Sequence, residues 1–213
     1  MGPNKMSKHG MLGWGMVILL MVTGCSTTRD GFAYRLYHNT NAKYNGFFYA
    51  TEAMEEAEQV LYEGYEENWD ETLSIFRPVD EATAQQVYPL MERAIEKCTK
   101  VVDKHNMSPS RPQQKDLKRP ELNKWIDDNY DVIARAHLIK GEKEKALEVF
   151  QYLVRTLDYP DAQAWSNAWM ARTYMAFDDR VRASNTLIEA AQTRRVDDPE
   201  EMVYVHEVYA AFY

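Results

Sequence analysis

Cysteine and glycine are both scarce in this chain of 213 residues, which contains two cysteines and nine glycines. It has no glycine-rich phosphate loop, and no Gly-x-Ser-x-Gly, His-Glu-x-x-His or Walker motif. The usual sequence signals of nucleotide-binding proteins, serine hydrolases and zinc proteases are therefore missing. Because Cys25 is assigned to lipid below, Cys98 has no cysteine partner, and an intramolecular disulfide is excluded.

Basic residues are also in the minority. The chain has 25 lysines and arginines against 33 aspartates and glutamates, a net charge of −8. Residues 1–24 hold two lysines and no acid, so without them 23 bases face 33 acids and the net charge is −10. An acidic chain with no basic stripe repels the phosphates of nucleic acids and disfavours a face that lies flat on anionic lipid. We therefore expect no nucleic-acid partner.

The N-terminus has the layout of a lipoprotein signal peptide. Two lysines precede an apolar segment at residues 11–22, and small residues then lead to Cys25. The segment is too short to cross a bilayer, which takes about 20 apolar residues. The sequence predicts that residues 1–24 are cleaved and that the Cys25 thiol carries lipid. A plain membrane anchor, or a cleaved signal followed by an incidental cysteine, is the alternative interpretation.

The residues after Cys25 indicate where the lipidated protein resides. Ser26 follows the cysteine, at a position where an aspartate would retain a lipoprotein in the inner membrane. No acidic cluster follows, as would suggest export to the cell surface in some phyla. Two or more acyl chains anchor a protein stably. We therefore predict an outer-membrane lipoprotein that is lipid-anchored and faces the periplasm.

Residues 25–46 are predicted to form a lipid tether and an extended arm. Tyrosines alternate there with polar residues, and this composition suits a contact that is partly dry and partly hydrogen-bonded. The candidate partner-binding residues are Tyr37, His38, Asn39, Lys43 and Tyr44. The alternative is that the arm only caps the first helix.

Apolar residues at spacings of three and four predict that the rest of the chain is all α-helical. A first hairpin is expected over 47–105 and a proline-containing loop over 106–120. The two helices of this hairpin are predicted at about 47–65 and 80–105. Pro89 is expected to kink or restart the second of them. Cys98 falls among apolar positions of the same helix and is expected to be a small buried residue.

Matching residues recur after residue 121 with an offset of 37. Ala134, His137, Ala146 and Phe150 align with Ala171, Tyr174, Ala183 and Leu187. Helices are expected at about 121–139, 143–157, 162–177 and 180–193, and another opens at Asp198. A tetratricopeptide repeat is a helix-turn-helix of about 34 residues. The sequence therefore predicts tetratricopeptide-like antiparallel hairpins stacked as a short solenoid over 121–213, truncated at its C-terminus. Ordinary hairpins with chance alanines are the alternative.

No group of catalytic or metal-binding residues is evident in the sequence. None of the five histidines stands at metal-ligand spacing from a nearby cysteine or carboxylate. The acid pair Asp127 and Asp128 favours a solvated helix face over acid–base chemistry. We therefore expect that the protein is not an enzyme, that it binds no metal or cofactor, and that it has no small-molecule substrate.

Three runs of residues resemble a known family. Residues 35–48, 88–98 and 124–130, in this order after the lipid cysteine, resemble the PorW/SprE lipoproteins of the Bacteroidota type IX secretion system. The resemblance extends from Cys25 to about residue 177, and family members are expected to be much longer than this chain. It implies a scaffold with tetratricopeptide repeats that links periplasmic motor and ring components to the outer-membrane translocon. Protein secretion, and gliding motility where present, would depend on it.

A nutrient- or glycan-binding helical lipoprotein is the second interpretation. Such a protein would display several tryptophans on one exposed platform. Trp125, Trp165 and Trp169 instead fall in helical stripes and are expected in the core. A cell-wall enzyme or its activator is disfavoured because no catalytic constellation is recognised.

Overall fold

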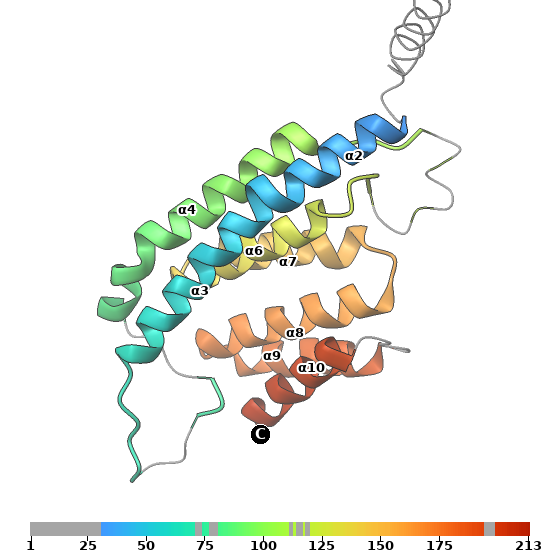
Figure 1. Cartoon of the computed structure of the whole chain (residues 1–213). Helices are drawn as coiled ribbons and strands as arrows, with labels where there is room; N and C mark the ends of the chain where they lie inside the picture. Colours follow the sequence, from blue (N-terminus) through green and yellow to red (C-terminus); the bar gives the residue numbers. More distant parts are fainter. Residues whose placement is uncertain are drawn as a thin grey trace, which may run out of the picture.

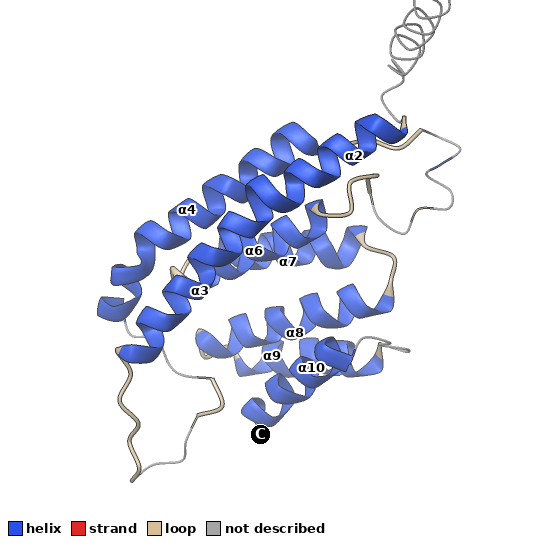
Figure 2. Ribbon diagram, viewed as in Figure 1, coloured by secondary structure: helices blue, strands red, loops and turns tan. Residues whose placement is uncertain are grey.

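A computed structural model describes residues 31–70, 74–76, 81–110, 113, 117, 120–193 and 199–213. The predicted signal peptide, Cys25 and the capping residue Asp198 lie outside these residues. Every regular element within them is a helix, so the all-α prediction is confirmed (Figure 2). None of the described helices is long and apolar enough to cross a membrane.

The helices pack in sequence order. They are α2 (Phe32–Asn41), the π-helix η1 (Ala42–Phe47), α3 (Phe48–Glu63), α4 (Glu81–His105), α6 (Ile126–Ile139), α7 (Lys143–Thr156), α8 (Pro160–Ala176), α9 (Arg180–Gln192) and α10 (Pro199–Phe212). Helices α2, η1 and α3 form one continuous rod antiparallel to α4 (Figure 1). Helix α6 packs on α4 and α7, and α8 packs on α7, α9 and α10.

Two apolar clusters make up most of the core. The first joins α3, α4 and α6, where the small residues Ala50, Ala53 and Ala57 allow close approach to α4. Cys98 is fully buried in this cluster, as expected, and burial raises the pKa of its thiol. The second cluster joins α6, α7 and α8 around Phe150, which is also fully buried.

The prediction of an extended arm was wrong for the part that the structure describes, because residues 32–47 are helical. The side-chain amides of Asn39 and Asn41 donate to carbonyls one turn earlier, each at 2.8 Å, so they do not compete with the helix. Helix η1 buries Ala42 and Gly46, whereas α2 buries none of its residues. A Cβ built on Gly46 would lie 1.8 Å from Val101 Cγ2, which shows how closely η1 approaches α4.

Two further observations concern the start of α6 and the continuity of α4. The helix predicted from residue 121 begins at Ile126, because Asn123 organises a turn. The Asn123 side chain accepts from the Trp125 amide at 3.1 Å and donates to the His105 carbonyl at 2.9 Å. Helix α4 runs through Pro89 without a restart.

The two hairpins α6–α7 and α8–α9 end their first helices with the same turn. Gly141 and Asp178, 37 residues apart, have φ of 74° and 56°. The amides of Glu142 and Asp179 each donate at 2.9 Å to a carbonyl five residues earlier. This is the Schellman arrangement, in which a left-handed residue follows the helix. The recurrence in sequence therefore coincides with a recurrence of backbone geometry.

Candidate functional site

A groove of about 740 Å³ is lined mainly by the first helices of the hairpins, α6 and α8, and by α10. Phe47 and Thr51 line it from the N-terminal rod, and Leu153 and Leu157 line it from the end of α7. Helical repeats commonly use a concave surface of this kind to bind partners. We therefore treat the groove as the candidate functional site.

Acidic side chains dominate the charge of the groove. Among the described residues that line it, five carry carboxylates, namely Asp127, Asp128, Asp131, Glu200 and Glu207, and one, Arg135, carries a cation. The formal charge of these described residues is therefore −4. The acids lie on two helices, at positions 127, 128 and 131 of α6 and at positions 200 and 207 of α10. Residues three, four or seven positions apart share one face of a helix, so the acids of each helix point into the same groove.

Arg135 is already engaged by carboxylates. Its guanidinium lies 3.5 Å from Asp131 Oδ2 and 3.4 Å from Glu58 Oε1. It also lies 4.8 Å from the centre of the Trp169 ring, within range of a cation–π interaction. The positive charge in the groove is therefore largely neutralised by its own neighbours.

Aromatic side chains form the floor of the groove, and hydrogen bonds fix their orientation. The Trp165 indole donates to Asp131 Oδ1 at 2.9 Å, and the Tyr159 hydroxyl donates to Asp127 Oδ2 at 2.6 Å. The rings of Trp165 and Tyr204 have centroids 4.7 Å apart. These contacts orient the floor side chains through partners within the chain itself.

Asp131 has a structural role in this site. Burial raises the pKa of its carboxyl, and the opposing effects of Arg135 and the Trp165 indole are smaller. Its Oδ1 accepts from the indole of Trp165, and its Oδ2 pairs with the guanidinium of Arg135. Asp131 therefore orients both of these side chains. The side chains of Asp128 and Glu207, at the rim of the groove, are exposed instead.

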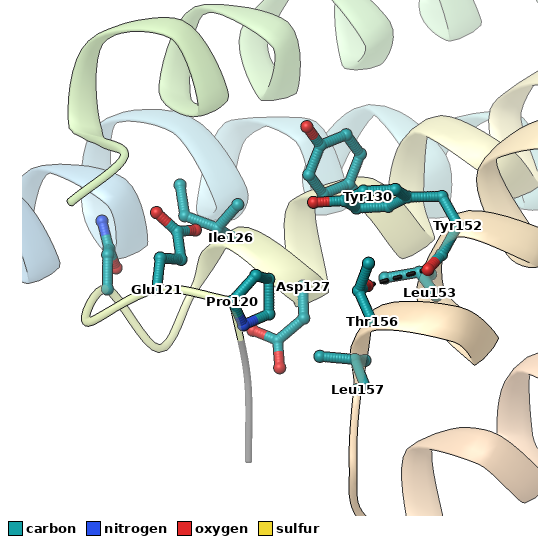
Figure 3. Close-up of a pocket in the computed structure, with 10 residues that line it drawn as sticks. Pro120, Glu121, Ile126, Asp127, Tyr130, Tyr152, Leu153, Thr156 and Leu157 are labelled. Carbon is teal, nitrogen blue, oxygen red and sulfur yellow. Dashed lines mark hydrogen bonds between the residues drawn. The ribbon is translucent and has the colours of Figure 1, made fainter. Parts of the chain in front are cut away.

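A second, much smaller cavity adjoins the groove and shares Asp127, Leu153 and Leu157 with it (Figure 3). Its volume of about 10 Å³ leaves room for roughly one water molecule. Tyr130 and Tyr152 close it. This cavity is too small to hold a ligand.

The predicted arm residues lie on α2 and η1 and differ in exposure and in the residues they contact. His38 and Asn39 face the domain: His38 Nδ1 lies 3.0 Å from His105 Nδ1, and Asn39 Oδ1 accepts from the Lys124 amide at 3.1 Å. Tyr37 and Tyr44 are 60% and 56% exposed.

The fifth arm residue, Lys43, lies between these two groups. Its Nζ is 5.0 Å from the ring centres of both Tyr44 and Trp125. None of the five arm residues is among the described residues that line the groove.

Sequence reasoning missed the groove, although signals for it were present. Asp127 and Asp128 were assigned to a solvated face, and the i, i+4 relation of Asp127 to Asp131 was overlooked. Trp169 is buried as expected, but Trp165 is half-buried and lines the groove. Over the described ranges, no three or more His, Cys, Asp or Glu side chains are placed to hold a metal ion.

Comparison with known proteins adds no relative. The chain matches no protein-family model, and no curated protein matches it in sequence. The features of the chain that bear on its function are therefore the groove, the recurring hairpins and the resemblance in sequence.

Proposed function

We propose that this protein is a non-enzymatic scaffold that binds segments of other proteins through tetratricopeptide-like hairpins. The groove carries this proposal, because the first helices of successive hairpins line it, as in a short solenoid with a concave binding face. The shared turns at Gly141 and Asp178 and the buried alanines Ala146 and Ala183 support a common repeat unit.

The resemblance to PorW/SprE lipoproteins suggests where this scaffold acts. We propose that Cys25 is lipidated and anchors the protein to the outer membrane, facing the periplasm. There it links motor and ring components of the type IX secretion apparatus to the translocon, which supports secretion and, where present, gliding motility. Two of the resembling runs contact each other, since Asn39 accepts from the Lys124 amide and the rings of Phe47 and Trp125 lie 5.4 Å apart.

Affinity capture from membranes tests this proposal. A tagged full-length chain with its lipid anchor is expected to recover motor, ring or translocon proteins. Cys25→Ala is expected to accumulate as the uncleaved precursor and to lose this recovery. Recovery of none of these proteins by a stably produced, lipidated chain would refute the assignment to type IX secretion, and lipid on the Cys25→Ala variant would refute the anchor.

A double change tests the role of the arm. Tyr37→Ala with Lys43→Ala removes one exposed ring and one of the two lysines that lie over the Trp125 ring. If the arm docks a partner, the variant keeps its helicity and melting temperature but loses partner capture and secretion. A large fall in melting temperature would instead assign these residues to capping, and normal secretion by a folded variant would remove the interface.

Glycan binding is the second candidate, because Tyr159, Trp165 and Tyr204 line the groove. The Trp165 ring packs on Tyr204 and its indole N–H is bonded to Asp131, so the ring is poorly placed to stack on a sugar. Screening the purified chain against soluble oligosaccharides decides between the two. Saturable binding that Trp165→Phe abolishes, without loss of stability, would favour the glycan-binding function.

A further inference from the structure

We infer that the groove binds a short cationic segment of a partner protein, with basic side chains facing α6 and α10 and apolar side chains resting on the aromatic floor. This inference rests on the proposed scaffold function and adds to it the chemistry of the partner. It concerns the groove alone and not the arm on α2 and η1.

The acidic side chains on α6 and α10, which form two walls of the groove, favour a partner of positive charge. Exposed acids lie on two different helices that line the same groove, Asp128 on α6 and Glu207 on α10. A lysine or arginine between these helices interacts favourably with both walls, whereas an acidic segment is repelled by both. Complementary potentials of this kind raise association rates and exclude partners of the wrong charge.

The groove itself is independent evidence of a binding site. Its volume of about 740 Å³ is within the range of clefts that enclose small ligands and short peptides. Phe47, Trp165, Val203 and Tyr204 give it an apolar surface as well as an acidic one. Interfaces are typically built from such aromatic anchors surrounded by a polar rim.

The rigid floor favours binding without rearrangement. Trp169 is buried against the floor residues Trp165 and Tyr204 and is not among the described residues that line the groove. Its ring centre lies 4.8 Å from the guanidinium carbon of Arg135 and 4.7 Å from that of Arg172. Tyr204 stacks on the same indole, with centroids 4.7 Å apart. A preorganised surface loses little conformational entropy when a segment binds. A protein segment with both lysine or arginine and aromatic or aliphatic side chains matches this surface.

Fluorescence anisotropy with defined peptides tests the inference. The probe is a fluorescein-labelled peptide of alternating lysine and tyrosine, added to the purified full chain. One comparison peptide replaces lysine with glutamate, and another replaces tyrosine with serine. We expect saturable binding of the first peptide, weaker binding at high salt because exposed charges are screened, and no binding of the glutamate peptide.

Matched charge reversals locate the binding. Asp128→Lys with Glu207→Lys changes the rim of the groove, and Glu148→Lys with Glu189→Lys makes the same change in net charge at exposed sites outside it on α7 and α9. We expect the groove variant to weaken binding about tenfold and the control pair to leave it nearly unchanged. Melting temperatures establish that both variants are folded.

Several results would overturn the inference. Absence of saturable binding would do so, as would equal losses in both variants, which would indicate unspecific attraction to an acidic protein. Equal affinity for the serine peptide would remove the role of the aromatic floor. The scaffold function is tested separately, by membrane capture with the groove variant. If this variant still captures secretion proteins, the scaffold function is supported, but the groove is rejected as its binding site.

Discussion

The N-terminal rod with α4 and the C-terminal pair of hairpins reach the same result, antiparallel helices on a shared core, by different means. In the hairpins, matching small and large residues recur every 37 positions and the same left-handed turn closes each first helix. In the N-terminal region, a continuous rod lies on one 25-residue helix. Polar contacts hold its end, through His38 to His105 and Asn39 to Lys124.

This difference separates two sources of stability. Buried apolar volume dominates in the hairpins, where the loss of a large side chain leaves a cavity. In the rod, the apolar contacts with α4 are made largely by small residues such as Ala50 and Ala53, and hydrogen bonds hold its N-terminal end. Small changes of shape or protonation are therefore expected to matter there. Each of the following predictions tests one side of this contrast.

The largest expected effect is the loss of Phe150 in the hairpin core. Phe150→Ala is expected to reduce the free energy of unfolding by about 3–5 kcal/mol, because the side chain is fully buried and stacks near Trp169. The equivalent Leu187→Ala is expected to cost about 2–5 kcal/mol. Urea unfolding followed by circular dichroism measures both. The exposed Val181→Ala is the control, and a comparable loss there would contradict a core centred on Phe150.

The next effect concerns the close contact of the rod with α4. Gly46→Ala is expected to cost about 1–3 kcal/mol, because the added methyl meets the stiff β-branched side chain of Val101. Inside a helix, replacing glycine by alanine normally gains about 0.5–1 kcal/mol, so the sign of the change is informative.

Gly64→Ala is the matched control for Gly46→Ala. Its nearest neighbours, the Val60 carbonyl and Thr83 Cγ2, lie 3.4 Å and 3.5 Å from the added atom, which is ordinary contact. Its melting temperature is expected to be unchanged or slightly higher. A stabilised Gly46→Ala variant would mean that η1 does not press against α4.

The turns of the hairpins give a smaller effect. Gly141→Ala is expected to cost about 1 kcal/mol, because the left-handed φ of 74° strains alanine although the space around it is open. Gly141→Asp is expected to cost less, since aspartate tolerates this conformation and occupies it at Asp178. Thermal unfolding measures both changes. Equal losses for alanine and aspartate would contradict the equivalence of the two turns.

The contrast also explains what could be predicted from the sequence. The hairpins could be predicted because three signals agree: the spacing of the apolar residues, the small residues at the helix contacts, and the Lys140-Gly141 sequence at a helix end. Each of these signals indicates a helical hairpin. The rod was missed because its asparagines and tyrosines resemble a loop in composition. Its contacts with α4 also join residues far apart in the sequence, as Gly46 and Val101 are.

The groove was missed for a related reason. Its walls come from α6, α8 and α10, and only the folded arrangement brings their acids together with Trp165 and Tyr204. The periodicity of the sequence identifies which side chains share one face of a helix. It does not identify which helix faces line a common groove in the folded chain. The five predicted arm residues were found as a group in sequence, yet the structure divides them between domain contacts and the surface.

The smallest expected effect is a pH dependence confined to the N-terminal region. Burial lowers the pKa of both His38 and His105 below about 6.5, the value in an unfolded chain, and the neighbouring charges of His38 and Lys104 lower the pKa of His105 further. The folded state therefore binds fewer protons than the unfolded state as the pH falls. Stability is complete above about pH 6.5 and declines below it.

Hydrogen exchange of α2 between about pH 7.5 and 5 measures this effect, after correction for the intrinsic exchange rate at each pH. We expect α2 to lose protection on acidification before the hairpins do, because doubly protonated rings repel each other and neither can accept across the 3.0 Å contact. Both rings are only half-buried, so solvent screening keeps the change small. His105→Gln should flatten the dependence, while His206→Gln, at an exposed position on α10, should retain it. Loss of protection at the same pH in α2 and in the hairpins would show that the rod and the hairpins unfold as one unit. Their stabilities would then not differ in the way proposed here.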